Sequence, residues 1–168
     1  MLRAGKPVVL ELGFDLVSAQ PAIAAHVAAT AKVEADAQTK SARIDALTIT
    51  VNLKGDSSPG GKVDAKLTAD IGVDGSKQTA TVRNLALTLL NLTINGSLDV
   101  TGLDKAPAIF GDLNLASFNP RELLEALGQA IPSTGSGVLT KLSLQTKLSA
   151  SATALALKPL NVLSMTRP

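Results

Sequence analysis

Hydrophobic and polar residues alternate along most of this chain. The clearest stretch is residues 62–74, where Val, Ala, Leu and Ile occupy every second position and Lys, Asp and Thr separate them. A period of two places the two kinds of side chain on opposite faces of a β-strand. The Ala-rich stretch 21–37 also has a period closer to two than to 3.6. Alternation therefore predicts strands over residues 7–18, 21–37, 43–54, 62–74, 78–90, 92–102, 138–149 and 152–160.

Turn signals separate these strands. Residues 55–62, GDSSPGGK, are rich in Gly, Ser and Pro, and Asp74-Gly75 marks a hairpin. Asn95-Gly96 could form another tight turn, but the alternation continues through it without a break. We therefore expect Gly96 to lie within a strand, on its apolar face.

The spacing of strands and turns predicts the fold class. A parallel sheet needs crossover helices between its strands, and the sequence has none. We therefore predict that residues 1–168 form a single, mainly β domain. Its expected form is a large antiparallel curled sheet (half-pipe, sandwich or barrel-like) of about nine strands, with one short α-helix near residues 119–128.

The helix has clear start and stop signals. Asn119 is a suitable N-cap, Pro120 stands at the first helical position, and Glu122 follows where a capping box needs it. We expect Asn119 to accept a backbone N–H bond, Glu122 to reach back to the cap, and Gly128 to end the helix in a left-handed conformation. The expected apolar surface of helix and sheet consists of Phe118, Leu123, Leu124, Leu127, Leu113 and Leu115.

Composition excludes several classes of function. The net charge is +2, from 16 basic and 14 acidic residues spread along the chain, and there are only three Phe and no Trp or Tyr. Without a basic cluster or aromatic platforms we expect no nucleic-acid binding. The absence of cysteine excludes disulfides and thiolate chemistry.

Catalytic and metal-binding patterns are also missing from the sequence. His26 is the only histidine, and it falls on the polar side of its strand. Asp64 and Asp70 lie on a polar strand face beside Lys62 and Lys66, an arrangement typical of cross-strand pairing. We therefore expect no enzyme activity, no cofactor, no metal site and no catalytic residues.

One stretch resembles a known family. The run GDLNLASFNPRELLEALG and the Leu-rich strands after it are similar to the AsmA family of Gram-negative bacteria. The resemblance covers residues 80–162. The positions that carry it are Gly111, Leu113, Leu115, Phe118, Asn119, Pro120, Arg121, Leu123, Leu124, Leu127 and Gly128.

The resemblance implies a periplasmic protein that takes part in outer-membrane assembly. Family members have an inner-membrane anchor and a longer β-rich region than this chain provides. We therefore expect a fragment, with its anchor and targeting segment outside this chain. Glu11 and Asp15 interrupt the first apolar stretch, which is therefore no signal peptide. Expected partners are the acyl chains of phospholipid or lipopolysaccharide, and the rest of the full-length protein.

The one-sided strands leave two interpretations open. Their apolar faces could form an ordinary packed core, or they could line a groove that holds acyl chains, with the helix either capping the core or closing the groove. A purely structural role is the alternative to lipid binding. In that case exposed sheet edges would pair with another protein or with a second copy, giving a homo-oligomer.

Overall fold

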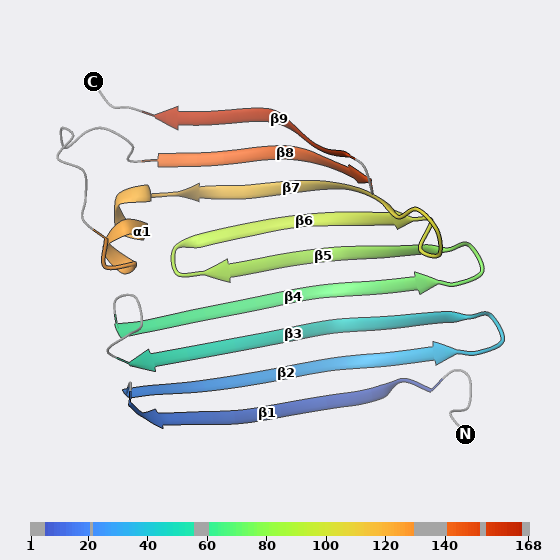
Figure 1. Cartoon of the computed structure of the whole chain (residues 1–168), viewed down its shortest axis with the longest axis horizontal. Coiled ribbons are helices and arrows are strands. Elements are labelled where there is room, and N and C mark those ends of the chain that lie inside the picture. Colours follow the sequence, from blue (N-terminus) through green and yellow to red (C-terminus); the bar gives the residue numbers. More distant parts are fainter. Residues whose placement is uncertain (1–5, 21, 56–60, 130–140, 152–153, 166–168) are drawn as a thin grey trace.

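The described residues form one open, curled β-sheet with one short helix at its end (Figure 1). The computed structural model describes residues 6–20, 22–55, 61–129, 141–151 and 154–165. The nine strands follow one another in sequence order, and every neighbouring pair is antiparallel. They are β1 (Val8–Ala19), β2 (Ala22–Asp36), β3 (Ser41–Gly55), β4 (Lys62–Asp74), β5 (Thr79–Leu89), β6 (Leu92–Thr101), β7 (Ala108–Phe118), β8 (Lys141–Ser151) and β9 (Ala154–Met165).

This architecture confirms the predicted fold class and narrows it. Of the three forms that the sequence allowed, the sheet has the open, curled one, because β1 and β9 are free edges and do not pair with each other. The predicted turn at residues 55–62 falls mostly on positions outside the described residues. Gly96 lies inside β6, paired with Leu85 and Leu113, as the uninterrupted alternation predicted.

The register aligns the apolar positions of successive strands. Paired residues of antiparallel strands share a face, so each register row can be followed across the sheet. One row is entirely aliphatic and continues in register to Val162 of β9. It consists of Leu12, Ala29, Ile49, Leu67, Leu87, Ile94, Leu115 and Leu144.

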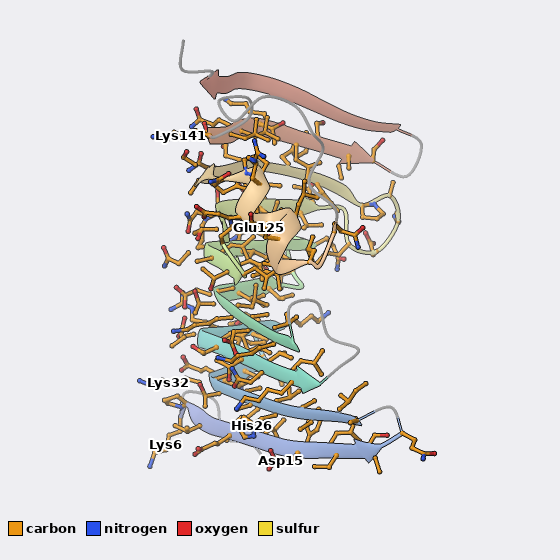
Figure 2. All side chains as sticks on the ribbon, turned by 90° about the vertical axis from the view of Figure 1, so that its left-hand side faces the viewer. Lys6, Asp15, His26, Lys32, Glu125 and Lys141 are labelled. Atoms are coloured by element: carbon orange, nitrogen blue, oxygen red, sulfur yellow. The ribbon has the colours of Figure 1, made fainter. Side chains whose placement is uncertain are left out.

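A second row has the same character with one gap. It contains Val8, Val33, Ile44, Ile71, Val82, Leu98, Gly111 and Leu148, and Gly111 is its only residue without a side chain. The intervening positions of these strands carry mostly Thr, Ser, Asn, Asp and Lys. Figure 2 shows the two sides, with Lys32 and Lys141 projecting from the same one.

Register shifts occur on alternate strands. β3, β5, β7 and β9 each carry an extra residue relative to their partners, as β-bulges do. The bulges of β3 and β5 include Ala46 and Asn84, whose φ angles are 52° and 51°. Asp70 of β4 lies between them. Its carboxylate accepts a bond from the Ala46 backbone N–H (2.8 Å) and another from the Asn84 side-chain amide (2.6 Å).

Two hairpins repeat the same design 38 residues apart. Asp36 and Asp74 each accept backbone N–H bonds from the turn that follows, and Lys40 and Gln78 end these turns at positive φ. The same spacing separates the two bulges described above. The turns also bond to each other, since Gly75 N–H donates to the Lys40 carbonyl at 2.8 Å. The β2–β3 hairpin and the β4–β5 hairpin are therefore two copies of one structural unit.

The helix α1 (Pro120–Ala126) confirms the predicted start and stop, with different partners in the cap. Asn119 Oδ1 accepts from the Arg121 backbone N–H at 3.0 Å, and Glu122 binds the Asn119 side-chain amide rather than its backbone. At the C-terminus Gly128 has φ 66°. Its N–H donates to the Glu125 carbonyl and the Gln129 N–H donates to the Leu124 carbonyl. This pair of bonds is a Schellman motif.

Replacing Gly128 should destabilise this helix end. Alanine is expected to cost about 1 kcal/mol, because a Cβ is unfavourable at positive φ. A Cβ here would meet no other atom within 4 Å, so the cost is purely conformational. Gly128→Asn should lose less, since asparagine tolerates the left-handed conformation better. Urea midpoints of the two variants test this, and equal losses would contradict the conformational explanation.

Candidate functional site

One side of the sheet is almost entirely apolar. This side, which carries the two rows above, is called the apolar face here, and Thr146 of β8 is a polar residue on it, opposite Leu113. Nine strands about 4.8 Å apart make the apolar face roughly 38 Å wide. Strands of ten or more residues give it an area of the order of 1,200 Å². The largest apolar patch on an ordinary monomer is about 300–600 Å². The apolar face therefore exceeds what a soluble surface normally carries.

Almost none of this surface is covered by protein. Among the described side chains, only Ala69 and Thr146 are buried. Large apolar residues on β1 are widely exposed, including Leu12 at 68% and Phe14 at 60%. The strands nearer the middle are half-buried by their neighbours alone. The described residues thus form a single layer without the dry core that a sandwich or a closed structure would have.

Two glycines allow close packing within the apolar face. Gly96 of β6 and Gly111 of β7 occupy apolar positions, and the Leu113 and Leu98 side chains lie over them. A Cβ on Gly96 would stand 2.7 Å from Leu113 Cδ2, and a Cβ on Gly111 would stand 2.5 Å from the Ser97 carbonyl oxygen. The Leu113 and Leu98 side chains therefore occupy the space above the two glycines, so the apolar face has no depression there.

The residues expected to form the apolar surface separate into two groups. Leu113 and Leu115 of β7 belong to the apolar face, and Phe118 at the end of that strand pairs with Leu142. The helix leucines do not belong to the register rows. They are half-buried on α1, which lies at the end of the sheet beside β5–β7 (Figure 1). The helix leucines are Leu123, Leu124 and Leu127.

Asn91 attaches the helix to the sheet. Its side-chain amide donates to the Asn119 carbonyl at 3.0 Å, which joins the β5–β6 turn to the helix start. None of the helix residues is fully buried. The placement of α1 at one end of the sheet leaves the middle of the apolar face open.

Sequence reasoning missed the special character of β1. This strand carries apolar residues on both faces, because Val9 and Val17 project from the polar side with 68% and 81% of their surfaces exposed. The signal was present in the sequence, since residues 8–17 contain valines at positions where alternation calls for polar side chains. The outer edge of β1 is therefore a second candidate site.

The polar face carries a network of exposed side chains near β1. His26 Nδ1 lies 2.7 Å from Asp15 Oδ1, and both side chains are more than half exposed. Asp64 accepts from Asn52 and pairs with Lys62 at 2.6 Å. The Lys62 ammonium, followed by the Asn52 amide, holds the pKa of Asp64 below its ordinary value. The ion pair of Lys62 and Asp64 thus lies within β4, and the bond that Asp64 accepts across strands comes from the uncharged Asn52 of β3.

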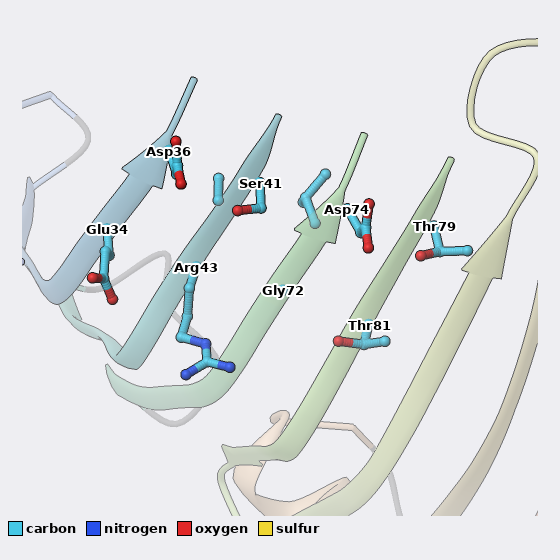
Figure 3. Close-up of a pocket in the computed structure, with 10 residues that line it drawn as sticks. Glu34, Asp36, Ser41, Arg43, Gly72, Asp74, Thr79 and Thr81 are labelled. Carbon is cyan, nitrogen blue, oxygen red and sulfur yellow. The ribbon is translucent and has the colours of Figure 1, made fainter. Parts of the chain in front are cut away.

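A shallow hollow of about 530 Å³ lies on the polar face over Gly72 (Figure 3). It forms because Gly72 stands between Arg43 and Thr81 in one register row and has no side chain. The carboxylates at its rim are already bonded. Asp36 accepts bonds from the backbone N–H groups of Gln38 and Thr39. Asp74 accepts from the backbone N–H of Lys77 in its own turn and from Lys77 Nζ at 2.8 Å.

These bonds favour the ionised form of both rim carboxylates. The Gln38 backbone N–H, followed by the Thr39 hydroxyl, keeps the pKa of Asp36 below its ordinary value. The Lys77 side chain, followed by its backbone N–H, does the same for Asp74. Both carboxylates therefore act as acceptors for the turns. Within the described part of the chain no three metal-ligating side chains come together.

The described residues contain no membrane-spanning helix, and the comparisons with known proteins found no relative. No helix among the described residues is long and apolar enough to cross a membrane. None of the family models, curated proteins or solved structures with which we compared the chain matches it.

Proposed function

We propose that this chain is a non-enzymatic lipid-binding module, which holds or passes acyl chains along its apolar face. The proposal includes a periplasmic location and a role in outer-membrane assembly, within a longer protein anchored in the inner membrane. The resemblance of the helix-start segment to the AsmA family supports that setting. The observation that carries lipid binding is the apolar face itself, with its aliphatic rows extending across all nine strands.

The total solvent-accessible area supports the proposal that a ligand covers the apolar face. The chain exposes 11372 Å², whereas a compact monomer of its 17.1 kDa mass exposes about 7,800 Å². This is roughly half as much again. Leaving an aliphatic side chain in water instead of burying it forgoes about 1.5–3 kcal/mol. A ligand that covers the apolar face would recover much of this free energy.

The chemistry and size of the apolar face suit acyl chains. It offers Leu, Ile, Val and Ala without a fixed pattern of hydrogen-bond donors, and such a surface does not orient a polar ligand. An acyl chain spans about half of a 30 Å hydrocarbon core, or roughly 15 Å. A face about 38 Å wide therefore has room for several chains side by side.

Lipid retention after exposure to vesicles tests the proposal. The purified chain is incubated with vesicles of phosphatidylethanolamine and phosphatidylglycerol, separated from them, and extracted for mass spectrometry. Retained phospholipid is expected. The double variant Leu12→Lys/Leu16→Lys, on the apolar face of β1, should retain less by at least about twofold, because two ammonium groups replace aliphatic contacts.

The control is a double variant on the same strand. Val9→Lys/Val17→Lys adds the same charge at positions that are at least as exposed, but on the polar side. It should retain as much lipid as the unmodified chain. Equal losses in both double variants, or no retained phospholipid in any sample, would refute binding at the apolar face.

A second function is favoured by a specific observation, the open outer edge of β1. In this alternative the chain is a structural scaffold that joins other proteins through its sheet edge. The exposed Val9 and Val17 support it, because lipid on the apolar face would leave both of them in water. The two functions involve different surfaces and can coexist.

A further inference from the structure

We propose that the outer edge of β1 binds an extended protein strand that carries a basic residue opposite Glu11. This inference builds on the second candidate function and specifies the chemistry of the partner. The outer edge is defined as the side of Val8–Ala19 that faces away from β2. In an antiparallel pair about half of the backbone N–H and C=O groups point away from the neighbour, so this edge offers a ladder for another strand.

The two sheet edges differ in how well they are protected. Natural edge strands are usually blocked by proline, lysine or a bulge. β9 has all three, since Lys158 and Pro159 lie beside its register irregularity. β1 has none of them, because its twelve residues pair with β2 without a shift and include no Pro, Lys or Arg. The sheet is therefore open at β1 and blocked at β9.

Side chains on both faces of β1 are suited to a neighbouring strand. Phe14 and Leu16 are 60% and 58% exposed on the apolar face, and Val9 and Val17 are even more exposed on the polar side. A strand added at this edge would place its side chains beside both sets. Cross-strand pairs of aliphatic and aromatic side chains stabilise such an arrangement.

Charge indicates which strand fits. Asp15 is bonded to His26, whereas Glu11 has no ion-pair partner among the described residues. A lysine or arginine opposite Glu11 would supply the missing cation. The partner is thus an extended segment that alternates apolar and polar residues, with a basic residue among the polar ones.

A second copy of this chain fits less well. Suppose two β1 strands pair antiparallel with their apolar faces on the same side of the joined sheet. The residue opposite Glu11 is then an odd-numbered one. No basic residue is available in any such register, because the odd-numbered positions of β1 are Val9, Glu11, Gly13, Asp15, Val17 and Ala19. Self-pairing would also bring acidic residues of the two copies together.

Peptide binding to the lipid-free chain tests the inference. The probe is the fluorescein-labelled peptide Thr-Val-Thr-Leu-Lys-Leu-Thr-Val-Thr, and the matched peptide has Glu in place of Lys. Fluorescence anisotropy should show tighter binding of the Lys peptide, and hydrogen exchange should slow in β1 but not in β9. Glu11→Lys should reverse the preference, with each peptide's affinity changing about fivefold, the equivalent of roughly 1 kcal/mol for a cross-strand charge pair.

Other results would overturn the inference. These are protection of β9 instead of β1, equal affinity for both peptides, a preference that Glu11→Lys leaves unchanged, or a β1–β1 dimer formed without peptide. Val9→Lys/Val17→Lys should weaken the Lys peptide while lipid retention stays normal. Leu12→Lys/Leu16→Lys should reduce lipid retention even where the edge proposal fails, so the two proposals fail separately.

Discussion

Replacing Gly111 with alanine is expected to lower the free energy of unfolding by about 1–3 kcal/mol, the cost of forcing extra volume into a packed position. The new Cβ would stand 2.5 Å from the Ser97 carbonyl oxygen and would also collide with the Leu98 side chain. Leu98 could rotate away, but the carbonyl belongs to the β6–β7 ladder and moves only if the strands separate. The urea midpoint, followed by circular dichroism, measures the loss.

Gly13→Ala is the matched control. Gly13 also lies within a strand, but its added Cβ would meet only the Val27 carbonyl oxygen at 3.9 Å, an ordinary contact. Alanine there should leave stability unchanged or raise it by up to about 1 kcal/mol, since glycine loses more conformational freedom on folding. If Gly111→Ala and Gly13→Ala had the same urea midpoint, close packing at Gly111 would be excluded as the reason for glycine there.

The second large effect is expected at Asp70. Asp70→Ala removes the acceptor of the Ala46 backbone N–H and of the Asn84 amide, and so releases the two bulges on either side of β4. Asp64→Ala is the comparison, because Asp64 binds only side chains, which water can solvate instead. Asp70→Ala should therefore lower the urea midpoint more than Asp64→Ala does. The opposite order would show that Asp70 does not hold the bulges.

The same contacts predict how stability depends on pH. The bond from Asn84, then the bond from the Ala46 N–H and the charge of Arg43, lower the pKa of Asp70 below its ordinary value of 3.8. A lowered pKa means that the stabilisation is complete above the unfolded value and disappears as the pH falls through the folded one. Asp70→Asn should make the fall in stability below about pH 4 shallower. Part of the fall should remain, because Asp36, Asp64 and Asp74 have lowered pKa values too.

Much of the fold was predictable because its information is local. Alternation assigns eight of the nine strands, all but β7, and the caps at Asn119 and Gly128 assign the helix, each within a few residues. The Asn95-Gly96 pair shows the strength of this reasoning, since periodicity correctly outweighed a common turn signal. A meander of neighbouring strands needs no further information to establish its order.

What could not be predicted depends on pairs of distant residues. The alternation of residues 62–74 is the same in a sandwich as in an open sheet, because it assigns faces and not what covers them. Ala46 carries no turn signature, and Asp70 of another strand bonds to both Ala46 and Asn84 at their positive φ angles. Likewise, the lone acid at Glu11 became informative only once β1 was known to be an edge.

The sequence-ordered sheet has a consequence for how the molecule gains and loses structure. Each strand packs chiefly against its neighbours along the chain, so coupling extends from strand to strand as in a one-dimensional array. The outermost strands have one neighbour each, so we expect them to open before the middle ones. Such a sheet can also become wider or narrower by gaining or losing whole hairpins. Each added or removed hairpin changes the width of the apolar face by about 10 Å and leaves the register of the other strands intact.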